Sequence, residues 1–128
     1  MKKEQKLETF LIPRLRRISM WWRGRNQAYK DAQSYISIGE YQNGNPKMKA
    51  VYRCAECERQ GIEGFYDRKD VQADHIIPVA NLSGFTNWNE YIIGLFCEKD
   101  GFQIICQFHH DEKTLKETEK RLDKKRKT

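Results

Sequence analysis

The chain has 128 residues, about the size of one domain, which excludes a large multidomain assembly. Hydrophobic residues make up 38% and charged residues 33%, so the chain can build one modest core, which a bound metal would help to stabilise. No apolar run approaches about 18 residues, and the lysine-rich start lacks the apolar stretch of a secretory signal. We therefore expect no membrane association and a cytoplasmic location.

Basic residues are concentrated at the two ends of the chain. The net charge is +6, and residues 1–30 hold nine basic and two acidic side chains. Residues 31–107 hold seven basic and eleven acidic side chains, and residues 108–128 hold eight and five. Basic segments attract polyphosphate backbones, which makes nucleic acid a natural partner. The alternative is that lysine-rich ends keep a small protein soluble.

The first thirty residues have a helical pattern. One face of this helix, which we expect to pack in the core, carries Leu11, Leu15, Ile18 and Trp22. We expect Gly24 to break or bend the helix and a second helical piece to run to about Ser37. A dense turn signal at residues 42–46 follows, so we set the bounds of a basic helical arm at residues 1–45.

The remainder of the chain predicts short strands, loops and one long helix. Strands are expected at residues 50–53, 71–77 and 102–105, and helices at 88–96 and 107–122. We assign residues 46–122 to one domain and residues 123–128 to a basic tail. The expected fold class is α+β.

The four cysteines indicate a metal site. Without an export signal they are expected to stay reduced, so two disulfides are disfavoured. Cys54 and Cys57 have the two-residue spacing of a metal knuckle, and Cys106 and His109 repeat it. Three thiolates and one imidazole suit tetrahedral, structural Zn²⁺. Cys97 has no partner in this scheme and is interpreted as a small buried hydrophobe, the alternative being that it replaces one of the ligands.

Two motifs around this site resemble the HNH endonucleases, the ββα-metal nuclease family. The first is Asp74-His75-Ile76-Ile77-Pro78 at the end of a predicted strand. The second, Ile105-Cys106-Gln107-Phe108-His109-His110-Asp111-Glu112-Lys113-Thr114, is similar to the family pattern L-C-x-x-C-H-x-x-K-T, with His109 in place of the second cysteine. The resemblance covers about residues 50–118. The segment 15–22 is also similar to the start of small phage-encoded members, which implies a phage or prophage source.

The resemblance implies a fold and a mechanism. The fold would be a small ββα-metal core with a structural zinc site and an N-terminal helical arm. His75 matches the family's general base, which takes a proton from the water that attacks phosphorus. Asp74 and His110 match the ligands of one divalent cation, Mg²⁺ or a similar ion, which stabilises the charge on the phosphate and leaving group. Lys113, one turn beyond His110, matches a phosphate contact.

The sequence departs from the family at its central asparagine. Asp100-Gly101 stands where that asparagine is expected. Asp100 or an asparagine of the preceding loop could take its structural part, the candidates being Asn81, Asn87 and Asn89. The residues do not decide between them.

Local backbone geometry limits which side chains can bind the same metal ion. Neighbours on a regular strand point to opposite faces, so Asp74 and His75 converge only if the strand ends or distorts there. Neighbours on a helix point about 100° apart, so His109 and His110 should serve different metals.

The arm is the second candidate DNA contact. Its arginines would track phosphates and an exposed Trp21 would pack on sugar or base; with Lys113, the candidate contacts are Arg14, Arg16, Arg17, Trp21, Arg23 and Arg25. The alternative is a solvated face, or pairing with the acidic middle of the chain.

The sequence therefore predicts a metal-dependent endonuclease that hydrolyses DNA phosphodiester bonds. The alternative function is a non-catalytic, zinc-containing module that binds nucleic acid, and a third is an adaptor without nucleic acid. A homodimer, and phage packaging or replication proteins as partners, are compatible with this class. The residues leave open the cleavage specificity, nicking against double-strand cutting, and the physiological cation.

Overall fold

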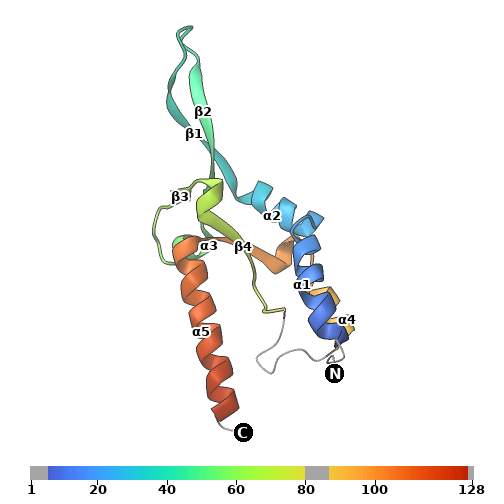
Figure 1. Cartoon of the computed structure of the whole chain (residues 1–128). Helices are drawn as coiled ribbons and strands as arrows, with labels where there is room; N and C mark the ends of the chain where they lie inside the picture. The colour runs from blue at the N-terminus through green and yellow to red at the C-terminus, as the bar shows by residue number, and fades with distance from the viewer. Residues whose placement is uncertain (1–5, 80–86, 127–128) are drawn as a thin grey trace, which may run out of the picture.

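The computed structural model describes residues 6–79 and 87–126 and combines helices with two small antiparallel sheets. The expected mixture of helix and strand is therefore confirmed. Figure 1 shows the smaller sheet at the centre, the long C-terminal helix on one side, the N-terminal helices on the other, and a hairpin that projects away from both. Within the described ranges, no helix is both long and apolar enough to cross a lipid bilayer.

Two helices open the chain, α1 (Leu7–Ser19) and α2 (Arg23–Ala32). The helix breaks before Trp22, whose backbone is extended, and not at Gly24 as the sequence suggested. Gly24 lies inside α2, where a Cβ would collide with the carbonyl oxygen of Cys97. This glycine therefore allows close packing and does not bend the helix.

The expected second helical piece is wrong beyond Ala32. Residues 33–40 form β1 (Gln33–Glu40), which pairs antiparallel with β2 (Pro46–Arg53). Tyr35, which continued the helical spacing, lies in the strand opposite Ala50. Alternating β-branched residues in this segment favour a strand, and pairing with β2 decided the outcome.

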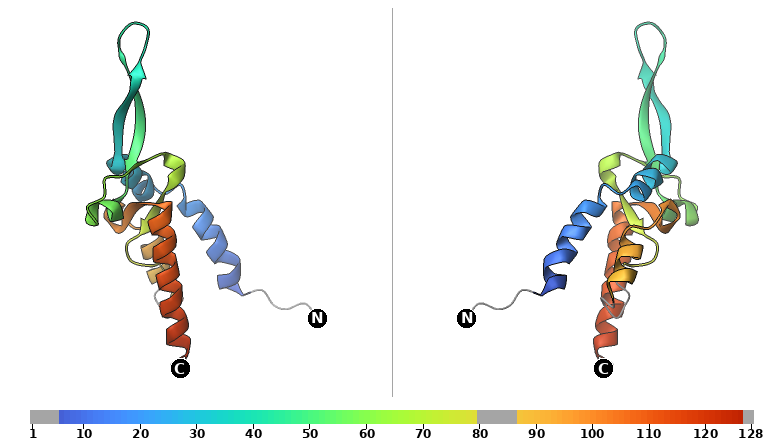
Figure 2. Two further views of the ribbon diagram at one scale, coloured as in Figure 1. Left: turned by 90° about the vertical axis from the view of Figure 1, so that its left-hand side faces the viewer. Right: turned by 90° about the vertical axis from the view of Figure 1, so that its right-hand side faces the viewer.

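The turn at residues 42–46 is confirmed, and it connects two paired strands. Its Gly44 has a positive φ of 85°, and the N–H of Tyr41 donates to the carbonyl oxygen of Asn45 at 2.8 Å. The segment boundary drawn at residue 45 therefore falls inside a hairpin. Figure 2 shows from both sides that this hairpin extends beyond the rest of the molecule.

Short elements lead from the hairpin to the central sheet. They are α3 (Ala55–Arg59), the two-residue strand β3 (Phe65–Tyr66), which pairs with β2, and the 3₁₀ turn η1 (Arg68–Asp70).

The central sheet consists of β4 (Val71–His75) and β5 (Phe102–Cys106). Between them lie α4 (Trp88–Leu95), close to the helix predicted at 88–96, and the 3₁₀ turn η2 (Lys99–Gly101). The strands run antiparallel, so Cys106 lies opposite the start of β4 and Phe102 opposite its end. β4 ends at His75, two residues earlier than expected.

The last helix, α5 (Gln107–Arg126), begins directly after β5. It passes the expected end at residue 122, so the segment assigned to a tail is helical as far as Arg126. Lysine, arginine and glutamate are good helix formers, and neither glycine nor proline interrupts the run. Residues 127–128 lie outside the described part of the chain.

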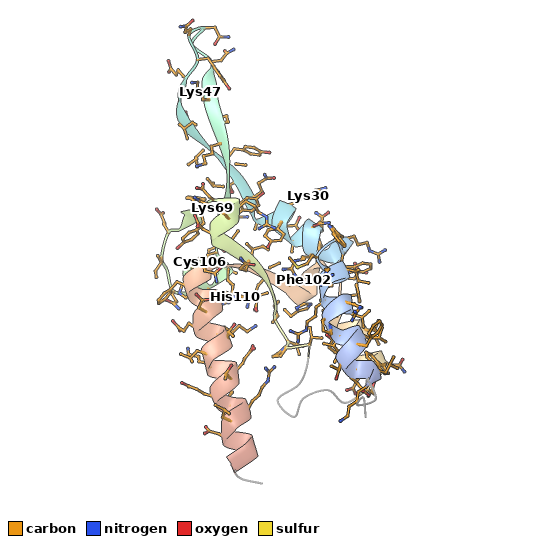
Figure 3. The ribbon with its side chains drawn as sticks, in the orientation of Figure 1. Lys30, Lys47, Lys69, Phe102, Cys106 and His110 are labelled. Atoms are coloured by element: carbon orange, nitrogen blue, oxygen red, sulfur yellow. The ribbon has the colours of Figure 1, made fainter. Side chains whose placement is uncertain are left out.

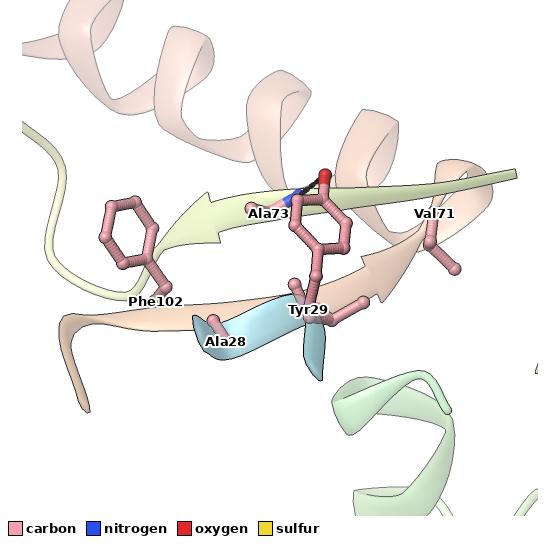
Figure 4. Packing of buried hydrophobic residues seen from close by; sticks show 6 residues of the cluster. Ala28, Tyr29, Val71, Ala73 and Phe102 are labelled. Carbon is pink, nitrogen blue, oxygen red and sulfur yellow. Dashed lines mark hydrogen bonds between the residues drawn. The ribbon is translucent and has the colours of Figure 1, made fainter. Parts of the chain in front are cut away.

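The main core lies between α2 and one face of the central sheet (Figure 4). Its buried members are Ala28, Tyr29, Val71, Ala73, Phe102 and Ile104. The N–H of Ala73, on the open edge of β4, donates to the hydroxyl of Tyr29 at 2.8 Å. The sheet is therefore tied to α2 by a hydrogen bond as well as by apolar contact.

A second core lies on the other side of β5. Ile105 is 1% exposed and packs with three cysteines, Cys54, Cys57 and Cys106. Because successive strand residues point to opposite faces, β5 contributes to both cores. This second core contains the predicted metal ligands.

Candidate functional site

Four predicted ligands converge in the second core. Cys54 follows β2, Cys57 lies in α3, Cys106 ends β5, and His109 lies in the first turn of α5. Their ligand atoms all lie within 4.8 Å of one another, and all four residues are buried. Figure 3 shows Cys106 at the junction between the sheet and α5.

The spacing of these atoms fits a tetrahedral ion. His109 Nδ1 lies 3.6 Å from the sulfur of Cys54, 3.5 Å from that of Cys57 and 3.2 Å from that of Cys106. Tetrahedral zinc, with Zn–S near 2.3 Å and Zn–N near 2.0 Å, would place sulfur and nitrogen roughly 3.5 Å apart. These residues could therefore hold a metal ion, and their donors suit structural zinc.

Backbone geometry prepares Cys54 as a thiolate. The N–H groups of Cys57 and Cys106 donate to its sulfur at 3.3 and 3.1 Å. Burial by itself would raise the pKa of Cys54, but these hydrogen bonds outweigh it and lower the pKa to about 7. The knuckle thus favours the charged form that binds metal.

Tyr66 is a neighbour of the cluster that the sequence analysis missed. Its hydroxyl lies 3.3 Å from the sulfur of Cys57. Burial raises the pKa of Cys57 to about 11, while the contact with Tyr66 opposes this rise. The aromatic pair after Gly64 was the available signal, but nothing in its spacing tied it to the cysteines.

Cys97 lies outside the cluster. It packs against the main core, and its sulfur fills the space that a side chain at Gly101 would need. Burial raises the pKa of its thiol.

The polar residues of the first motif lie at the far end of the central sheet. The Asp74 carboxylate accepts from Gln103 Nε2 at 2.9 Å and from Lys113 Nζ. Lys113 also donates to the carbonyl oxygen of His75 at 2.7 Å. The lysine expected to contact phosphate thus connects α5 to the end of β4.

His75 points away from Asp74, as strand geometry requires. Its Nε2 lies 3.1 Å from the carbonyl oxygen of Leu95, and its ring packs on Phe102 with centroids 4.6 Å apart. Because a carbonyl oxygen can only accept, Nε2 carries the hydrogen and Nδ1 keeps its lone pair. Burial lowers the pKa of the imidazole, so the neutral form is favoured.

His110 and His109 diverge, as the helical geometry predicted. His110 lies in the first turn of α5, close to the sheet in Figure 3, and three residues before Lys113. Residues three apart share a helix face, so His110 lies on the face through which Lys113 reaches Asp74. Its Nδ1 is buried and has no hydrogen-bond partner among the described residues; a carboxylate oxygen of Asp111 lies 3.8 Å away.

The candidates for the family's asparagine take different positions. The side chain of Asn87 caps α4 by accepting from the N–H of Glu90 at 2.8 Å. Asn89 and Asp100 are exposed, and Asn81 lies outside the described residues. Of these, Asn87 has the loop-fixing geometry.

Two arginines of the arm bind other parts of the chain. Arg16 Nε donates to the hydroxyl of Tyr91 at 3.2 Å, and Arg23 forms an exposed ion pair with Glu98 at 2.7 Å. α1 and α2 are thereby joined to the segment around α4.

The rest of the arm is more exposed, with one exception. Trp21 is 72% exposed, Arg17 is exposed, and the Arg14 guanidinium lies over the Phe10 ring. Ile18, expected in the core, is 50% exposed. By contrast, Arg25 is buried.

Comparisons of the chain with protein families, with curated proteins and with solved structures found no match.

Proposed function

We propose that the protein is a metal-dependent endonuclease of the HNH type that hydrolyses DNA phosphodiester bonds. The observation that carries the proposal is the set of polar side chains on the unit formed by β4, β5 and α5. A neutral histidine with one free ring nitrogen, a carboxylate, and an unpartnered imidazole nitrogen lie on a β-β-α unit, contributed by His75, Asp74 and His110.

His75 would act as the general base. Leu95 fixes the ring through Nε2, which leaves Nδ1 to accept a proton from water. The water oxygen would attack phosphorus as the bond to the leaving oxygen breaks. Packing on Phe102 holds the ring, so little freedom is lost when the substrate binds.

Asp74 and His110 would hold a divalent cation, which would stabilise negative charge on the phosphate and the leaving oxygen. Two protein ligands are few, but Mg²⁺ commonly keeps several waters and binds through one or two carboxylates. Gln103 and Lys113 orient the Asp74 carboxylate. Zinc at the cysteine cluster would hold α5 against the sheet and so set the position of His110.

A plasmid-cleavage assay tests the proposal. Wild-type protein should nick or linearise plasmid in Mg²⁺ or Mn²⁺, and EDTA should abolish the reaction. His75→Ala should lower the rate by roughly 10²–10⁴-fold, the usual contribution of a general base. Gln72→Ala is the matched control, because Gln72 lies on the same strand and its side chain donates to exposed Gln107.

The competing function is a zinc module that binds nucleic acid without cutting it. It is favoured by the hydrogen bonds that already satisfy Asp74. If wild-type protein binds DNA but leaves it intact in Mg²⁺, Mn²⁺, Ni²⁺ and Zn²⁺, this function replaces the nuclease.

A further inference from the structure

Arg25 is a buried cation without a protein partner. The residue is 9% exposed, and within the described part of the chain its guanidinium has no hydrogen bond and no ion pair. Burying a charge is unfavourable unless a partner compensates it. None of the Arg25 nitrogens, however, is among the described side-chain atoms that are both buried and unpartnered, so the charged group still reaches solvent, where an anion from outside the chain can bind it.

The way in which α2 packs against β4 places Arg25 near His75. Tyr29 bonds to Ala73 of β4, which marks where the helix crosses the strand. Arg25 is four residues before Tyr29, on the same face and roughly 6 Å along the helix. His75 is two residues beyond Ala73, on the same strand face and roughly 6.6 Å along the strand.

A second set of contacts fixes this end of α2. Trp22 Nε1 donates to the carbonyl oxygen of Cys97 at 2.5 Å, and Gly24 packs against the same carbonyl group. The carbonyl group of Leu95, two residues earlier, holds His75. The short segment 95–97 thus contacts both the start of α2 and the imidazole of His75. Burial lowers the pKa of His75, and the positive charge of Arg25 lowers it further.

We propose that Arg25 binds the non-bridging oxygens of the phosphate that is cleaved, as a phosphate clamp next to the general base. A guanidinium offers two parallel N–H groups that match two phosphate oxygens. The substrate would supply the missing anion at the point where negative charge develops. This assignment rests on the proposed nuclease function and gives Arg25 a role different from that of the exposed arginines.

Arg25→Met tests the clamp, because methionine keeps an unbranched stem and removes the charge. We expect the melting temperature to stay within a few degrees of wild type, cleavage to fall by roughly 100-fold or more, and zinc content to stay at wild-type level. The salt dependence of DNA binding should lose about one unit of slope. Lys30→Met is the control: this lysine is exposed on the same helix and is not among the candidate DNA contacts, so cleavage should change less than about threefold.

Each other result overturns the clamp. A melting temperature lowered by more than a few degrees, or an unfolded Arg25→Met protein, would show that the guanidinium is structural. Wild-type cleavage by the variant, or an unchanged salt slope, would show that it does not touch the phosphate. These results leave the nuclease proposal intact if the wild-type protein cuts plasmid, whereas a wild-type protein that never cuts refutes both proposals.

Discussion

The two ends of the β4–β5 pair differ in whether their polar groups find partners within the chain. We call the end near Cys106 the closed end and the end near His75 the open end. At the end near Cys106, four buried ligand atoms converge within 4.8 Å, and each has its neighbours inside the chain. At the end near His75, one imidazole nitrogen keeps its lone pair, and Arg25 has no anion among the described residues; His110 Nδ1, on the face of α5 through which Lys113 reaches Asp74, has no hydrogen bond there either. A closed set of this kind serves stability, whereas unsatisfied groups reduce stability and are expected where a substrate or ion completes them.

The largest effect should follow from opening the closed end. Cys54→Ser replaces a thiolate ligand, which also accepts from two N–H groups, by a shorter and neutral hydroxyl, and structural zinc contributes on the order of 10 kcal/mol to folding. We expect loss of stoichiometric zinc and of the cooperative thermal transition, measured by metal analysis and circular dichroism. Cys97→Ser is the matched control and should keep its zinc, because Cys97 lies outside the cluster. A folded Cys54→Ser protein with one bound zinc would refute the assignment.

The adjacent histidines of α5 sharpen the comparison. His109→Ala should unfold the protein, since it removes a cluster ligand. His110→Ala should cost less than about 1 kcal/mol, because Nδ1 has no hydrogen bond to lose. The same change should raise the divalent-ion concentration needed for half-maximal cleavage by roughly tenfold or more. Denaturant titration and cleavage at graded Mg²⁺ check both parts; equal destabilisation by the two changes would contradict the division of roles.

The smallest expected effect concerns the exposed arm. Arg17→Gln should reduce the salt slope of DNA binding by about one unit if Arg17 contacts a phosphate, with little change in stability. Arg16→Gln should have a smaller effect on the slope, because Arg16 is bonded to Tyr91. Binding isotherms at several salt concentrations give the slopes. Unchanged slopes in both variants would show that α1 does not touch DNA.

The sequence predicted the closed end better than the open one, for a physical reason. A tetrahedral ion requires short, fixed spacers, and both Cys54/Cys57 and Cys106/His109 display them. The strands and the last helix followed from their apolar patterns. The interaction of Lys113 with Asp74 was missed, because it depends on how α5 packs on the sheet.

The errors occurred where tertiary contacts overrode local pattern. The helical spacing of Ala28 and Ala32 continued to Tyr35, but pairing with β2 drew that residue into a strand. The sequence predicts Arg25 to be one of the DNA-contacting arginines of the arm, because nothing in the neighbouring residues indicates that it is buried. The close approach of Gly24 to Cys97 likewise involves residues far apart in the chain, which a pattern cannot reveal.

The positions of the cluster ligands along the chain connect folding with protein synthesis. A nascent chain that has reached Cys57 offers two ligands, which exchange an ion readily. The complementary pair follows much later, since Cys54 and Cys106 are 52 positions apart. The domain therefore closes in one late step, and fragments interrupted before Cys106 should be left open to proteases.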